Sequence, residues 1–179
     1  VKEGRVWLNL RAANSKDGEI GQLSQSILSE MKTAMRGFHP IKPDLGLIIS
    51  SPNARVFYHL DVAQVMLFHV RGHKRIYVYP RTEKYVRAVD LEGVVTHETE
   101  EEIPYAAEFD AGASVVDLEP GQMVSWEQNA PHRVENGDDM NVSLSFEYMT
   151  PVGIARANTI FANAWLRKRF GYQATLEPR

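Results

Sequence analysis

The sequence predicts a mainly β fold with one helix near each end of the chain. Between about 45 and 150, short runs of β-branched and aromatic residues are separated by turns rich in Gly, Pro and Asn. Residues 19–35 and 151–170 instead repeat apolar side chains every three or four residues, the spacing of one helix face. With 179 residues, 44% of them hydrophobic, the chain can bury a sizeable core, and we expect a single domain over 1–179.

The first helix is expected from Glu19 to Met35, after the candidate cap residues Ser15 and Asp17. Strands are expected on either side of it, over 5–10 and 44–50. The helix would cover one side of the sheet with its apolar positions Ile20, Leu23, Ile27, Met31 and Met35.

A β-hairpin is predicted over 64–80, because two apolar runs flank a short turn that contains Gly72. On the returning strand Lys74, Ile76 and Val78 share one face, which should point inward. A lysine in such a row needs an anionic partner, which is either a structural carboxylate or a bound ligand.

The middle of the chain is less regular. A short helix is predicted over 81–90. The acidic stretch 96–110 is interpreted as a solvated connection between strands in preference to a partner-binding acidic patch. Further strands are expected over 114–118, 121–126, 132–136 and 141–146.

The last helix is expected over 151–170, with Thr150 as its cap and Pro151 at its first position. It would either pack on its own strands or form a homodimer. The basic residues Arg167, Lys168 and Arg169 would complement the negative end of the helix. One face is expected to carry Ile154, Ala157, Phe161, Ala164, Trp165 and Lys168.

The composition excludes several kinds of chemistry. The sequence contains no cysteine, which rules out disulfides, thiolate zinc sites and cysteine nucleophiles, and we expect a cytoplasmic location. A formal net charge of -3 gives no electrostatic basis for binding nucleic acid, and no apolar run approaches the roughly 20 residues of a membrane span. Because the sequence opens with Val1 in a strand-like segment without a signal-peptide pattern, we expect part of the natural N-terminus to be missing.

A candidate metal site is formed by His59, Asp61 and His132. An extended chain directs His59 and Asp61 to the same face, and His132 follows a strand, a tight turn and the start of another strand. Two histidines and one carboxylate form the facial triad with which non-heme Fe(II) proteins bind their metal and leave coordination positions open.

The remaining histidines and Trp126 receive structural interpretations. His69 could approach the site, but a hydrogen-bonded core position is favoured over a ligand role. His73 and His97 are expected to be exposed, in a turn and in the acidic stretch, and His39 precedes a proline in a linker. Trp126 is expected in the core.

These motifs resemble the cupin-fold, JmjC-type oxygenases that depend on Fe(II) and 2-oxoglutarate, including the asparaginyl hydroxylase of hypoxia-inducible factor. In that family a His-x-Asp pair precedes an apolar strand, a Gly turn and a Lys, as His59, Asp61, Gly72 and Lys74 do here. Gly121, His132 and Asn136 match the second cupin motif. The resemblance covers about 45–150 and implies a double-stranded β-helix, the cupin or jelly-roll barrel.

The resemblance implies a hydroxylase that binds Fe(II) through His59, Asp61 and His132 and the distal carboxylate of 2-oxoglutarate through Lys74. Ser143 or Ser145, on the last strand, would face the co-substrate. The substrate would be a protein side chain or a small molecule.

Two positions differ from the family pattern: Val56 replaces a common threonine, and Pro131 precedes the distal histidine. They keep two alternatives open. One is a cupin that binds a metal or small ligand without oxygenase activity, as a sensor or isomerase, and the other is a structural cupin whose His59 and His132 are merely hydrogen-bonded.

Overall fold

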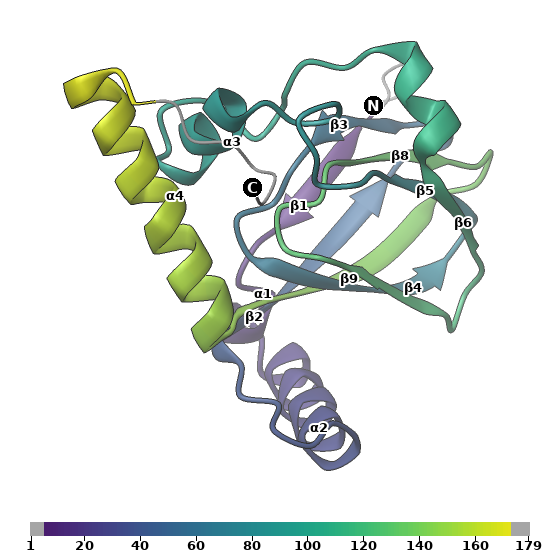
Figure 1. Ribbon diagram of the computed structural model, residues 1–179. Coiled ribbons are helices and arrows are strands. Elements are labelled where there is room, and N and C mark those ends of the chain that lie inside the picture. The colour runs from purple at the N-terminus through teal and green to yellow at the C-terminus, as the bar shows by residue number, and fades with distance from the viewer. Residues whose placement is uncertain (1–5, 173–179) are drawn as a thin grey trace.

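The computed structural model describes residues 6–172, and in this range nine strands form two antiparallel sheets (Figure 1). The larger sheet has the order β1 (Trp7–Leu10), β2 (Ile41–Ser50), β9 (Asn141–Met149), β4 (Gln64–Arg71) and β7 (Met123–Trp126). The smaller sheet has the order β3 (Arg55–His59), β8 (His132–Asn136), β5 (Lys74–Val78) and β6 (Ser114–Leu118). The predicted strands are therefore present, with ends shifted by a few residues.

The strand pairing is nested, which makes the fold a jelly roll. The first core strand pairs with the last, β2 with β9, and inside this pair β3 joins β8, β4 joins β7 and β5 joins β6. Most consecutive strands pass from one sheet to the other, so the chain winds around a common interior. The predicted mainly β fold with a double-stranded β-helix is confirmed.

The predicted terminal helices are confirmed, and their caps explain where they begin. Helix α2 (Gly18–Ala34) follows Asp17, whose carboxylate accepts hydrogen bonds from the amides of Glu19 and Ile20. Helix α4 (Pro151–Phe170) follows Thr150, whose hydroxyl accepts from the Gly153 amide at 3.0 Å. A short helix that was not predicted, α1 (Ala13–Lys16), precedes α2.

The helix predicted over 81–90 is wrong in position. The structure has turns after Pro80 and a helix, α3, over Ala88–Val95. The later window forms the helix because it buries Leu91 and Val94, which join the apolar cluster beneath α4.

Three apolar clusters hold these layers together. Between the sheets lie the side chains of Leu67, Ile76, Leu118 and Val134. Met31 of α2 packs on the outer face of the larger sheet, and Ile160 of α4 packs on α3. The helices therefore cover the β-roll from outside and leave its interior available for a site.

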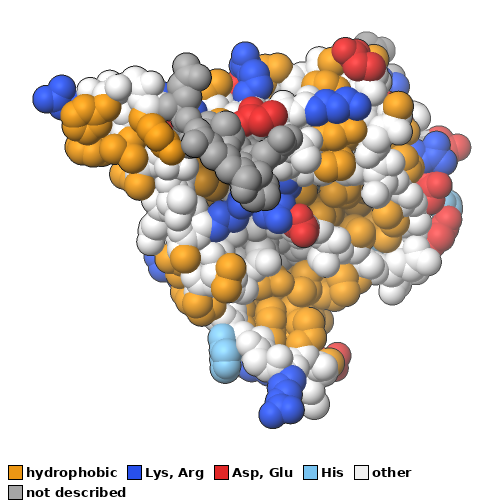
Figure 2. All heavy atoms as spheres, viewed as in Figure 1, with side chains coloured by type: hydrophobic (Ala, Val, Ile, Leu, Met, Phe, Trp, Pro, Cys, Tyr) orange, Lys and Arg blue, Asp and Glu red, His pale blue; other side chains and the backbone are white. Residues whose placement is uncertain are grey.

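The face that α4 buries agrees with the predicted one only in part: Ala164 is buried and Ala157 packs on the apolar cluster, as predicted, but Phe161 and Trp165 do not join them. Its buried residues are Gly153, Ile160 and Ala164, whereas Phe161 and Trp165 are each 57% exposed. Both stripes have helical spacing, so periodicity alone could not choose between them. Figure 2 shows apolar side chains gathered over the C-terminal end of this helix.

No helix among the described residues is both long enough and apolar enough to cross a membrane.

Candidate metal centre

Strand pairing brings the three predicted metal ligands together. His59 is the last residue of β3 and His132 the first of β8, and the two residues are register partners. Asp61 lies two residues beyond His59, just outside the strand. Its carboxylate oxygens are 3.9 Å from Nε2 of His59 and 3.3 Å from Nε2 of His132. One ligand atom from each residue lies within 4.8 Å of the other two, close enough to share an ion.

Both imidazoles are oriented by main-chain carbonyls. Nδ1 of His59 lies 2.8 Å from the Phe57 carbonyl oxygen, and Nδ1 of His132 lies 3.0 Å from that of Ala130. Because a carbonyl oxygen only accepts, each Nδ1 must carry the proton, and each Nε2 presents its lone pair to the site. Burial also lowers the pKa of both histidines, which favours the neutral form that binds metals.

The environment of Asp61 suits a bound cation. Burial, and next to it the negative charge of Glu101, raises the pKa of Asp61 to about 7, while Arg11 and the Trp126 indole act in the opposite direction. An ionised carboxylate facing two neutral imidazoles is stabilised by a divalent cation placed between them. The donor set of two imidazole nitrogens and one carboxylate oxygen fits the non-heme Fe(II) type of site.

The centre opens into a cavity of about 500 Å³ between the two sheets. Lys74 and Ser145 line it together with the three candidate ligands. Ser145 is buried, and its hydroxyl lies 3.3 Å from a carboxylate oxygen of Glu147, which also faces the cavity. The size is typical of pockets for small ligands.

Lys74 lines this cavity as a buried cation that forms no ion pair with any other described residue. Only 4% of the residue is exposed, and its ammonium group donates to Oδ1 of Asn136 at 2.7 Å. Within residues 6–172 no carboxylate forms an ion pair with it, so the alternative of a structural carboxylate partner is not supported. Burial lowers the pKa of Lys74 to about 8, and an anionic ligand would reverse this shift.

The acidic stretch is part of the cavity wall, which the sequence interpretation missed. The Leu60 amide donates to the Glu101 carbonyl, and the Ile103 amide donates to the Tyr58 carbonyl, so this segment extends the smaller sheet beside β3. Its side chains at 100–102 face the cavity, and Glu101 pairs with Arg11 across the entrance at 3.1 Å. Charge density alone gave no sign of this pairing.

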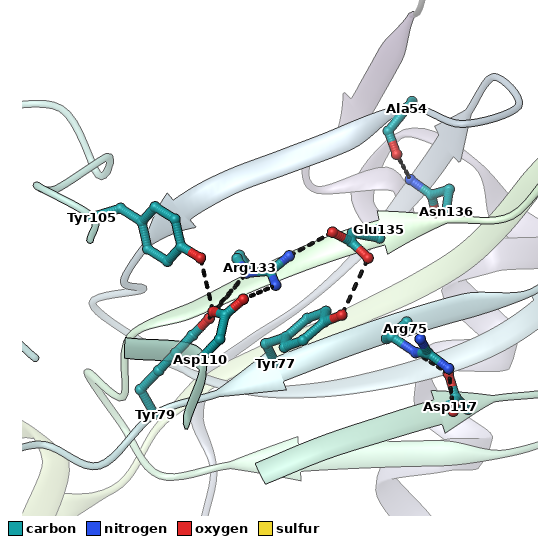
Figure 3. A network of polar contacts seen from close by, with 10 residues as sticks. All are labelled: Ala54, Arg75, Tyr77, Tyr79, Tyr105, Asp110, Asp117, Arg133, Glu135 and Asn136. Carbon is teal, nitrogen blue, oxygen red and sulfur yellow. Dashed lines mark hydrogen bonds and ion pairs between the residues drawn. The ribbon is translucent and has the colours of Figure 1, made fainter. Parts of the chain in front are cut away.

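A second groove, of about 850 Å³, adjoins the cavity along Arg55, Val56 and Phe57. Its wall is held by Arg133, whose guanidinium pairs with Asp110 at 2.6 Å and with Glu135 at 2.7 Å (Figure 3). The Tyr79 and Tyr105 hydroxyls donate to the same Asp110 carboxylate. This network fixes the 3₁₀ turn Ala107–Gly112 against β8 and shapes the groove.

The remaining histidines and Trp126 lie either in the core or at the surface. His69 is a buried core residue whose ring nitrogens contact the Ser143 hydroxyl and the Gly72 carbonyl, so Ser143 does not line the cavity as Ser145 does. His39 and His97 are exposed, and His73 pairs with Glu119 at the surface. Trp126 packs on the core and also contacts the His132 ring, with ring centroids 4.4 Å apart and the planes tilted by 42°.

Comparison with known proteins shows the fold. No protein-family model matches the sequence, and no curated protein matches it. The solved structure of Escherichia coli ycfD aligns over 100% of this chain and 44% of its own, with a TM-score of 0.60 and 18% sequence identity. A crystal structure of the Escherichia coli ribosomal oxygenase YcfD covers 97% of this chain and 40% of its own, with a TM-score of 0.55 and 18% identity.

The fold is thus one that an oxygenase also uses, and the chain spans less than half the length of that Escherichia coli protein. The narrower resemblance to the asparaginyl hydroxylase stays a prediction.

Proposed function

We propose that this chain is an Fe(II)- and 2-oxoglutarate-dependent oxygenase, a hydroxylase that acts on a protein side chain or a small molecule. The observation that carries the proposal is the grouping of His59, Asp61 and His132 in one cavity with a buried Lys74 that has no carboxylate partner between residues 6 and 172. A metal held by the three candidate ligands would bind one end of a metal-chelating dicarboxylate, and the ammonium group of Lys74 would bind the carboxylate at the other end. The fold shared with a ribosomal oxygenase supports the same proposal.

Each group has a separate role. His59, Asp61 and His132 would hold Fe(II), and Lys74 would bind the distal carboxylate of 2-oxoglutarate, with Ser145 beside it. Iron and 2-oxoglutarate together would supply the oxidising chemistry, in which the co-substrate becomes succinate and carbon dioxide and an oxygen atom enters the substrate. The apolar side chains of Val65, Leu67 and Val134 exclude water from that point.

The co-substrate assignment is compatible with Val56, which replaces the threonine common at this position in the oxygenases that the sequence resembles. Val56 lines the cavity but offers no hydroxyl, so we assign binding of the dicarboxylate to Lys74 and Ser145. A substrate can approach along the second groove, which shares Arg55, Val56 and Phe57 with the cavity. We also propose a cytoplasmic location, on the absence of cysteine.

The decisive experiment is substrate-free turnover. With Fe(II) and oxygen, the protein should form succinate from 2-oxoglutarate, and Asp61→Ala should abolish this activity while the surface variant Asp117→Ala retains it. Metal uptake with neither turnover nor a thermal shift from N-oxalylglycine would support the alternative of a metal-binding cupin without oxygenase activity. Absence of any metal binding would contradict both.

We propose in addition that α4 forms a homodimer contact. Phe161, Trp165 and Phe170 are 57%, 57% and 67% exposed, and the Trp165 and Phe170 rings contact each other. Light scattering should give twice the chain mass for the wild type and a single chain mass for Trp165→Glu. A monomeric wild type at micromolar concentration would contradict this proposal.

A further inference from the structure

The turn that precedes His132 connects three parts of the chain that are distant in sequence. The turn is closed by a hydrogen bond from the Ala130 amide to the Glu127 carbonyl, and Asn129 adopts a left-handed conformation with φ of 60°. Asn tolerates this conformation better than most residues. Gln128 and Asn129 are nevertheless only 5% and 3% exposed, so their amide groups point into the protein.

Asn129 links the Asp61 loop to α4. Its side-chain nitrogen donates to the main-chain carbonyl of Asp61 at 2.9 Å. Its side-chain oxygen accepts from Nε of Arg156 on α4 at 3.2 Å. Both ends of the amide are therefore engaged, and the side chain cannot turn without breaking a contact in a buried position.

Gln128, the residue before Asn129, makes an equivalent connection between α4 and Val62, the residue after Asp61. Its side-chain nitrogen donates to the Val62 carbonyl at 2.8 Å and to the Gly153 carbonyl at 3.3 Å. Gly153 permits this approach, because a Cβ at that position would lie 2.9 Å from Oε1 of Gln128. The first turn of α4 is thus fastened to the same junction.

We propose that Asn129 and Gln128 are positioning residues for the metal centre and that α4 anchors them. Asp61 lies outside β3 and has no strand ladder to fix it, whereas His59 and His132 are held by their register. The amides of Asn129 and Gln128 replace that ladder by holding the carbonyls of Asp61 and Val62 at a set distance from β8. The inference rests on the proposed metal site.

The test compares metal binding by the wild type, Asn129→Gly and Arg156→Met. Asn129→Gly keeps the left-handed turn and removes only the amide, so the affinity for Co(II) should fall by about 10-fold or more, as for other groups that orient ligands. Arg156→Met releases the other end of the amide from a half-buried site and should give a smaller fall. The visible spectrum of bound Co(II) should change with each variant, because the Asp61 ligand is displaced.

A second readout needs no metal. Amide hydrogen exchange over 60–63 should be faster in metal-free Asn129→Gly than in the wild type. Thr159→Ala, one turn further along α4, is the matched control and should change neither measurement, because its hydroxyl contacts only the Ala155 carbonyl of its own helix.

The outcomes distinguish this inference from the proposed function. If the wild type binds Co(II) and both variants bind it with equal affinity and spectrum, the positioning role is wrong and the metal site stands. If the wild type binds no divalent metal, both are wrong. Should Asn129→Gly not fold, Arg156→Met alone decides between these results, with the melting temperature of each metal-free protein as the check on folding.

Discussion

At the scale of single residues, Lys74 combines a functional advantage with a cost in stability. Burial without a counter-charge lowers its pKa to about 8 from the usual 10.5. Between these pH values the unfolded chain binds the proton more tightly than the folded chain, so the free energy of unfolding rises as pH increases from about 8 to 10.5. Below that range the charged lysine destabilises the ligand-free protein by roughly 3 kcal/mol.

Replacing this lysine should therefore remove ligand binding without loss of stability at neutral pH. In Lys74→Met the side-chain oxygen Oδ1 of Asn136 loses its donor, which costs about 1–3 kcal/mol and offsets the gain from removing the buried charge. In urea at pH 7 we expect a free energy of unfolding within about 1 kcal/mol of the wild type, and a relative loss of roughly 3 kcal/mol by pH 10.5.

N-oxalylglycine should no longer raise the melting temperature of this variant. The exposed Lys32→Met on α2 serves as the control and should show neither effect. Parallel pH profiles for the wild type and Lys74→Met would contradict the buried-charge argument.

The residues that could be read from the sequence are those whose placement depends on local alternation. Lys74 falls on the inward face of β5 and His59 ends β3 beside Asp61, because a strand fixes which side chains share a face. The partnership of Lys74 with Asn136 and the contact of Trp126 with His132 depend instead on pairing between distant strands. No local pattern encodes those contacts, so they appear only in the folded chain.

At the scale of elements, α4 is fastened to α3 by a buried ion pair. Arg167 pairs with Glu92 through two hydrogen bonds, of 2.7 and 3.2 Å, and Glu92 is only 5% exposed. Lys168 pairs with Glu98 beside it. The basic end of α4 was expected to complement the helix dipole, but two of its three cations make specific contacts with the α3 region.

Replacing only one partner of this ion pair should destabilise the protein more than replacing both partners. Arg167→Met leaves the Glu92 carboxylate buried without a partner, and we expect a loss of about 3 kcal/mol in urea unfolding. The double variant Arg167→Met/Glu92→Gln should recover at least half of that loss, because no uncompensated charge remains. Equal losses in the single and the double variant would show that packing, and not the buried charge, determines the effect.

At the scale of the whole molecule, the nested pairing explains why the site joins distant parts of the chain. The pairing of β3 with β8 brings His59 and His132 together across more than seventy residues of sequence. The mainly β class and the terminal helices follow from periodicity, whereas the position of α3 and the role of the acidic segment follow from tertiary packing. The overall architecture was thus more predictable than the wall of its cavity.

Because the candidate ligands lie on both sides of this pairing, a bound metal should stabilise the whole fold. A ligand present at about 100 times its Kd, and bound only by the folded state, contributes about 2.7 kcal/mol, which corresponds to roughly 5–10 °C in melting temperature for a domain of this size. We expect Mn(II), a redox-stable substitute for Fe(II), to produce such a shift and EDTA to reverse it. Asp61→Asn keeps the shape of the side chain but weakens the ligand, and it should abolish most of the shift, whereas the surface variant Asp117→Asn should retain it. A shift of equal size in Asp61→Asn would place the metal elsewhere, with the exposed carboxylates of Glu100 and Glu102 at the cavity entrance as the next site to replace.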